Sequence, residues 1–158
     1  DENINLIKVE TADEMFNATQ KNLPVDVAIL SAAVGDFKVK DKKREKIKKE
    51  KYFNLNLEKN IDILNYISNH NNFRPKIVIV FAAETNDLQK NAKKKLIEKN
   101  CDWIIANDVS NKSIGFNSDF NELFIFYKNK NFHDEKISFK KKSEISDEII
   151  DKVISHLN

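Results

Sequence analysis

The sequence predicts an α/β fold in which a mostly parallel sheet carries helices on both faces. Short apolar runs rich in β-branched residues alternate along the chain with helical patterns, and this alternation is typical of strand–helix–strand units. Residues 25–31, 76–85 and 102–108 are nearly continuous apolar runs, as expected for strands buried on both sides of a parallel sheet. Together these observations predict a Rossmann-like architecture of three layers.

The first half of the chain is expected to contain three strands and two helices. Thr11 and Glu14 have the spacing of a capping box, so a helix is expected to begin there and to run to about Lys21. A second, short helix is expected at 60–68. The expected strands are 4–9, the buried strand 25–31, and an edge strand at 53–57.

The second half is expected to add two helices, the strands 76–85 and 102–108, and a hairpin. In residues 86–100, Leu88, Ala92 and Leu96 lie on one helical stripe. The last helix, 144–157, has Ile145, Ile149, Val153 and Leu157 at intervals of four. The apolar segments 122–127 and 136–140 are joined by a polar loop, and they predict an antiparallel pair at the edge of the sheet.

Length and composition indicate one globular domain over residues 1–158. The chain is 41% hydrophobic and 33% charged, and no apolar run approaches the ~20 residues that a membrane-spanning helix needs. A single cysteine excludes an internal disulfide, and the first residues do not have the pattern of a signal peptide. Both observations favour a cytoplasmic location. Because the chain begins with Asp1 and its only methionine is Met15, we expect the domain to be incomplete at its N-terminus.

Positive charge is concentrated in one segment. Residues 38–51 carry nine basic and three acidic side chains, a net charge of +6, which leaves −4 for the rest because the chain total is +2. A local excess of this kind predicts one anion-binding loop rather than a surface that is basic throughout. The chain has only two glycines, Gly35 and Gly115, so a glycine-rich phosphate loop is excluded.

The three buried strands are followed by small and polar residues. The segments read SAAVGD at 31–36, FAAET at 81–85 and ANDVS at 106–110. In open α/β sheets, ligands bind beyond the carboxyl ends of the parallel strands. Small residues let a ligand approach the backbone, so these endings predict a binding site at that edge.

Six segments occur in the order and at the spacing found in one known family. AAVGDF (32–37), EKIKK (45–49), KNIDIL (59–64), FAAETN (81–86), IIANDVS (104–110) and GFNSDFNEL (115–123) resemble bacterial phosphopantothenoylcysteine synthetase. That enzyme is the ligase half of the bifunctional coenzyme A biosynthesis flavoprotein. The likeness runs from about Val9 to the C-terminus, and six ordered motifs are far more specific than one.

The resemblance implies a CTP-dependent ligase that joins 4′-phosphopantothenate to cysteine through an acyl-cytidylate. The implied ligands are CTP with Mg²⁺, 4′-phosphopantothenate and cysteine. The Mg²⁺ ion is expected to be held mainly by the triphosphate, and no protein ligand is assigned to it. No flavin is expected in this domain. Because the family is dimeric, a homodimer is expected, with a decarboxylase flavoprotein that is either fused or separate.

The same resemblance implies eleven site residues. Asp36 would read the base or sugar beside the backbone of Ala32 and Ala33, and Lys46 would reach the reacting phosphate. Ile61 stands where the family usually has proline. The implied nucleotide-binding residues are Ala32, Ala33, Asp36, Lys46, Ile61, Asp62, Ile63, Leu64, Phe81, Lys95 and Lys99, of which Lys46 is also catalytic.

Spacing alone leaves plainer interpretations open. Asp36 could cap a turn, Phe81 could be a core residue, and Lys95 and Lys99 could be ordinary surface lysines of a helix. Two other functions remain as alternatives. One is a module that binds RNA or DNA through the basic loop 38–51. The lack of aromatic residues within this loop argues against it. The other is an inactive or regulatory relative of the synthetase.

Overall fold

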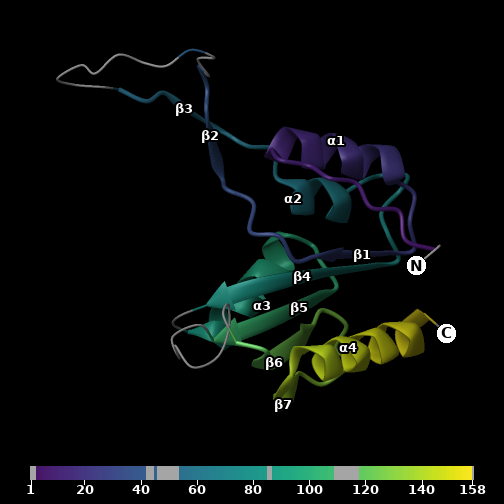
Figure 1. Cartoon of the computed structure of the whole chain (residues 1–158). Helices are drawn as coiled ribbons and strands as arrows, with labels where there is room; N and C mark the ends of the chain where they lie inside the picture. Colours follow the sequence, from purple (N-terminus) through teal and green to yellow (C-terminus); the bar gives the residue numbers. More distant parts are fainter. Residues whose placement is uncertain (1–2, 42–44, 46–53, 85–86, 109–117, 158) are drawn as a thin grey trace. The chain divides into compact units, whose positions relative to one another are not determined.

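The computed structural model describes residues 3–41, 45, 54–84, 87–108 and 118–157, and the chain divides into two units. The hairpin unit comprises Asp1–Leu23 and Ala33–Ile63, and the sheet unit comprises Pro24–Ala32 and Leu64–Asn158. Figure 1 labels their helices and strands. The expectation of a single domain over 1–158 stays a prediction.

The sheet unit is built on five strands in the order β1-β4-β5-β6-β7. β1, β4 and β5 are parallel, whereas β5–β6 and β6–β7 are antiparallel pairs, so the mixed sheet ends in the expected hairpin. Helices flank it, and the Rossmann-like α/β prediction is confirmed. The elements are β1 (Val27–Leu30), α2 (Ile63–Ser68), β4 (Ile77–Glu84), α3 (Leu88–Glu98), β5 (Trp103–Asp108), β6 (Phe120–Tyr127), β7 (Glu135–Lys141) and α4 (Lys142–Leu157).

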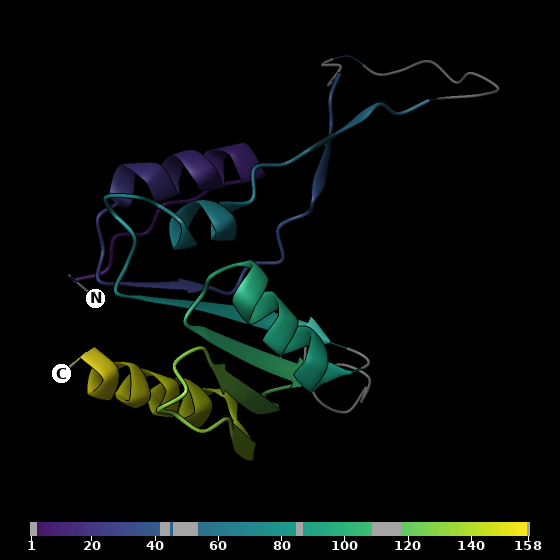
Figure 2. The same ribbon diagram turned by 180° about the vertical axis from the view of Figure 1, so that it is seen from behind.

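The core of the sheet unit lies on both faces of β4 and β5. Because side chains alternate along a strand, Ile79 and Ile105 point to one face and Val78 and Ile104 to the other, and all four are fully buried. The first face packs against Ile145, Ile149 and Val153 of α4. α3 covers the other face with Ala92 and Leu96, and Figures 1 and 2 show the two helices on opposite sides of the sheet.

The hairpin unit consists of α1 (Ala12–Asn22) and the antiparallel pair of β2 (Phe37–Val39) and β3 (Leu57–Lys59). The predicted capping box is present: Thr11 Oγ1 accepts from the Glu14 N–H, and the Glu14 carboxylate accepts from the Thr11 N–H. Lys38 of β2 donates to both carboxylate oxygens of Asp13 at 2.8 Å. Polar contacts therefore connect α1 to the hairpin, since α1 buries no residue.

Three expected strands differ from those observed. Residues 4–9 form no strand, because Ile4 and Leu6 are exposed and no described strand pairs with this segment. The strand 25–31 is at the sheet edge as β1 rather than fully buried, so Ile29 is 42% exposed. The expected strand 53–57 begins only at Leu57 as β3, where pairing with β2 sets its position, and residue 53 lies outside the described residues.

The helices that the described residues form include none long and apolar enough to cross a membrane.

The two-sided burial predicts a large difference between two isoleucines. Ile105 is fully buried in β5, whereas Ile97 on α3 is 75% exposed. Ile105→Ala should lower the free energy of unfolding by about 2–5 kcal/mol, because it deletes buried methyl groups and leaves a cavity. Ile97→Ala should change it by less than about 0.5 kcal/mol. Urea unfolding followed by the fluorescence of Trp103 measures both, and equal effects would contradict this description of the core.

Candidate functional site

Two segments predicted to bind the nucleotide lie side by side in the hairpin unit. The β2–β3 ladder pairs Phe37 with Lys59. One residue further, the Asn60 main-chain N–H donates to the Asp36 carbonyl at 2.8 Å, and Asn60 Nδ2 donates to the Gly35 carbonyl at 2.7 Å. The turn at 35–36 and the segment that begins at residue 61 are thus joined by one asparagine.

The predicted residues of these segments differ in exposure. Ala33, Asp36, Ile61 and Asp62 are exposed to solvent. Ile63 and Leu64 are instead buried at the start of α2, where only their backbone is suited to contact a nucleotide.

The sheet unit holds the carboxyl ends of β4 and β5. The parallel ladder continues through the pairs Ala82–Ala106, Ala83–Asn107 and Glu84–Asp108, so small residues sit beside polar ones, as the sequence predicts. Ala32 follows β1 and is exposed. Phe81 lies just before these pairs, and its ring packs against the buried cluster on the α4 face.

The structure does not bring Lys95 and Lys99 next to Phe81. Both lysines lie near the end of α3, which covers the opposite face of the sheet from the cluster that Phe81 contacts. Their helix begins just after β4 ends and runs back toward the start of β5, so they lie near the amino end of that strand. A nucleotide role for these lysines stays a prediction.

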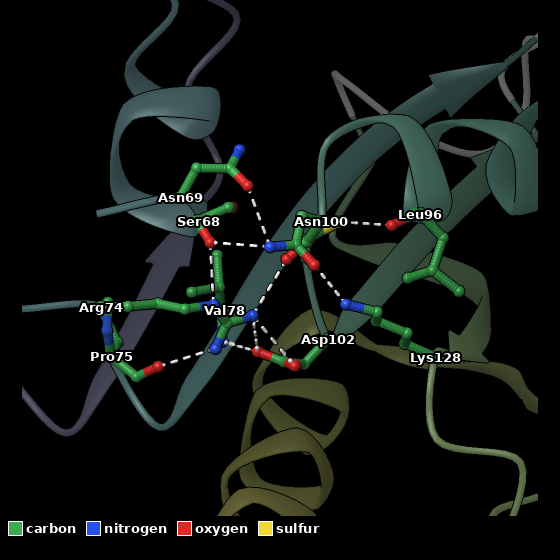
Figure 3. A network of polar contacts seen from close by, with 10 residues as sticks. Ser68, Asn69, Arg74, Pro75, Val78, Leu96, Asn100, Asp102 and Lys128 are labelled. Atoms are coloured by element: carbon green, nitrogen blue, oxygen red, sulfur yellow. Dashed lines mark hydrogen bonds and ion pairs between the residues drawn. The ribbon is translucent and has the colours of Figure 1, made fainter. Parts of the chain in front are cut away.

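A polar network anchors the end of α3, and Figure 3 shows it. The Arg74 guanidinium donates to the carbonyls of Ser68 and Asn100 and to the Asp102 carboxylate, with distances of 2.8–3.1 Å. Asp102 Oδ2 also accepts from the Val78 N–H at 2.7 Å. Arg74 therefore holds the last residue of α2 beside the turn from α3 to β5, where Asn100 adopts a positive φ of 55°.

Sequence reasoning missed both Asn60 and Arg74. Arg74 has a weak signal: the chain has 27 Lys and Arg residues, and only positions 44 and 74 are arginine. An arginine in a lysine-rich sequence indicates a position that needs several fixed donors. Asn60 lies within the KNIDIL motif (59–64), and this position is its only signal, because asparagine is abundant throughout the chain.

The basic segment 38–51 is described only in part. Lys46 lies outside the described residues. Lys38 is paired with Asp13 and lies 3.7 Å from Glu58, and the hydrogen bond to Asp13 is the main reason that its pKa is raised. The positive charge of Lys38 is therefore compensated by carboxylates of the hairpin unit.

Cys101 is not suited to nucleophilic chemistry. It is fully buried, and burial raises the pKa of its thiol to about 11, although nearby Lys95 acts in the opposite direction. The described part of the chain also contains no group of three or more His, Cys, Asp or Glu residues that could hold a metal ion.

A mixed α/β sheet with small and polar residues at its strand ends is typical of the class of α/β proteins that bind ligands at that edge. The family model described as "DNA/pantothenate metabolism flavoprotein C-terminal domain" matches residues 1–157. The chain belongs to this family.

Curated relatives and solved structures agree with this assignment. The chain is 37% identical to the coenzyme A biosynthesis bifunctional protein CoaBC of Haemophilus influenzae over 96% of its length, and 39% identical to that of Borreliella burgdorferi over 94%. It spans 37% of the length of each. A crystal structure of the C-terminal domain of a CoaBC protein superposes with a TM-score of 0.69 at 29% identity, covering 96% of this chain and 65% of that one.

A second solved structure shows the same fold at lower identity. The DNA/pantothenate metabolism flavoprotein from Streptococcus pneumoniae is 20% identical, with a TM-score of 0.69 over 96% of this chain and 70% of that chain.

The Arg74 network predicts the reactivity of Cys101. At pH 8 the raised pKa alone should slow labelling of the folded thiol about a hundredfold relative to the unfolded chain. Arg74→Lys keeps the charge but loses the planar fork, so the turn around Cys101 should open more often and label about tenfold faster than in the parent. Mass spectrometry of the Cys101 peptide measures the rates.

Lys76→Gln is the matched control for this experiment. Lys76 pairs with Asp26 at 2.9 Å, but both side chains are about 70% exposed, so its removal should leave the labelling rate unchanged. Equal rates in Arg74→Lys and the parent would show that Arg74 does not hold this turn.

Proposed function

We propose that this chain is the ligase part of a coenzyme A biosynthesis enzyme, a CTP-dependent phosphopantothenate–cysteine ligase. The observation that carries the proposal is the match of residues 1–157 to a pantothenate-metabolism C-terminal domain, with relatives named CoaBC that are 37–39% identical. The hydrogen bonds of Asn60 to the carbonyls of Gly35 and Asp36 support it, because they join the turn of Asp36 to the segment 61–64, and the resemblance assigns Asp36 and 61–64 to one nucleotide.

The proposed reaction has two steps. A carboxylate oxygen of 4′-phosphopantothenate attacks the α-phosphorus of CTP, and pyrophosphate leaves as the acyl-cytidylate forms. The amine of cysteine then attacks the acyl carbon, loses a proton, and displaces CMP. Both steps concentrate negative charge around phosphate, so fixed cationic donors are the main contribution expected from the protein.

The chain's own residues have distinct roles in this proposal. The Asp36 carboxylate and the backbone of 32–33 and 61–64 bind the base and sugar, and Phe81 lies against the base. Lys46 stabilises charge at the α-phosphate, while Lys95 and Lys99 add contacts to the nucleotide. Mg²⁺ enters as part of the substrate, Mg²⁺–CTP, with the triphosphate as its main ligand. The domain itself uses no flavin.

The relatives suggest partners for the whole protein. Because they are bifunctional and longer than this chain, we propose a decarboxylase flavoprotein as a partner, fused or separate. The resemblance to a dimeric family is the ground for proposing a homodimer.

Base selection gives the first test of this function. The full-length natural protein should bind CTP at least about tenfold more tightly than ATP, a difference of about 1.4 kcal/mol. Asp36, Phe81 and the 61–64 segment motivate this expectation, because together they would contact the base. Titration calorimetry with both nucleotides measures it, and equal affinities would refute cytosine selection.

Lys46 should differ from the lysines around it. A charged donor at a developing oxyanion is worth on the order of 3 kcal/mol, so Lys46→Gln should lower kcat at least about a hundredfold and change CTP affinity only severalfold. Lys42→Gln and Lys43→Gln should stay within about threefold of the parent, because neither lysine has the motif position of Lys46. Pyrophosphate release and calorimetry give the two quantities. Similar effects for all three variants would remove the catalytic assignment of Lys46.

A further inference from the structure

We infer that Asn60 is a positioning residue that sets nucleotide selectivity by locking the turn that carries Asp36 to the segment 61–64. This inference rests on the proposed function and extends it to Asn60, which lies in the KNIDIL motif (59–64) but to which neither the resemblance nor the comparisons give a role. In this proposal Asn60 acts through the turn that carries Asp36.

The two hydrogen bonds of Asn60 are directed at adjacent carbonyls. Its main-chain N–H binds the Asp36 carbonyl at 2.8 Å, and its side-chain Nδ2 binds the Gly35 carbonyl at 2.7 Å. Two donors from one residue fix both the separation and the rotation of the turn relative to residue 61, which a single bond cannot do. Because the backbone of residues 35–36 is fixed in this way, the position from which the Asp36 carboxylate extends is fixed as well.

The orientation of the Asn60 amide is determined by its surroundings. A carbonyl oxygen only accepts hydrogen bonds, so Gly35 requires the Nδ2 end of the amide. The Oδ1 end is buried and accepts no hydrogen bond within the described part of the chain. A rotated amide would place two oxygens together, so the side chain has one favourable orientation.

The turn needs this external support because its own contacts are few. Residues 31–37 are all exposed, and a Cβ built on Gly35 would meet only the Phe37 carbonyl within 4 Å, at 3.7 Å. The turn is therefore not held by packing. An exposed carboxylate on a loosely held turn discriminates poorly between bases, because selectivity requires fixed donors and acceptors.

The test compares nucleotide preference in two variants of Asn60. Asn60→Ala removes the side-chain bond, and Asn60→Asp keeps the shape but places a carboxylate against the Gly35 carbonyl; both keep the main-chain N–H. In the full-length protein we expect CTP affinity to fall about tenfold in each variant, while ATP affinity changes less than threefold. The ratio of the two affinities is the readout, since a general loss of stability lowers both.

Asn56→Ala is the matched control, because Asn56 lies on the same hairpin and its Nδ2 contacts the exposed Asp41 only at 3.4 Å. It should leave both affinities within twofold. Asp36→Asn should lower the CTP preference in the parent but add little in the Asn60→Ala background, since both changes act through the same carboxylate.

Each outcome decides the proposal. Equal losses for CTP and ATP, additive effects with Asp36→Asn, or an unchanged preference in both Asn60 variants would overturn the role of Asn60 and leave the proposed function standing. A parent that binds neither nucleotide would overturn the proposed function and this inference with it.

Discussion

Burial of β4 and β5 on both faces is the constraint on which the sheet unit depends. Val78, Ile79, Ile104 and Ile105 expose no surface, so each face of these two strands must be covered by a helix. α3 and α4 meet this requirement from opposite sides. The β4–β5 ladder continues from these buried residues to Ala83 and Asn107 at the carboxyl ends of the two strands, where the side chains are small or polar. The same burial that stabilises the sheet therefore also determines where a ligand can approach it.

The hairpin unit is organised by directed polar contacts instead. α1 has no buried residue, and its polar contacts include a capping box and the Lys38–Asp13 ion pair. Such contacts stabilise little individually when they are exposed, but each has a defined geometry. Asn60 belongs to the same set, because it orders two carbonyls without adding to a core. A unit of this kind is suited to presenting exposed groups such as Asp36 and Asp62.

Local and periodic signals explain which elements the sequence could predict. The apolar runs at 76–85 and 102–108 became β4 and β5, and Thr11 with Glu14 formed the expected cap, because these patterns depend only on neighbouring residues. The run at 25–31 has the same composition, yet it became an edge strand, since its neighbours in space are not encoded in its own pattern. Arg74 bonds Asn100 and Asp102, which are 26 and 28 residues away, and contacts this distant escape any local pattern.

The placement of lysines shows why charge density alone is a poor guide to an anion site. The excess of +6 in residues 38–51 counts Lys38, whose charge is balanced by Asp13 from another element. Lys93 and Lys94 likewise pair with Asp134 and Glu98. A lysine whose charge is already compensated attracts a phosphate weakly, whereas one held at a desolvated phosphate oxygen acts strongly. In a sequence with this many lysines, charge density does not single out one cation. The proposed role of Lys46 therefore rests on its position in a motif, and uncharged groups such as Asn60 indicate how the turns are held in place.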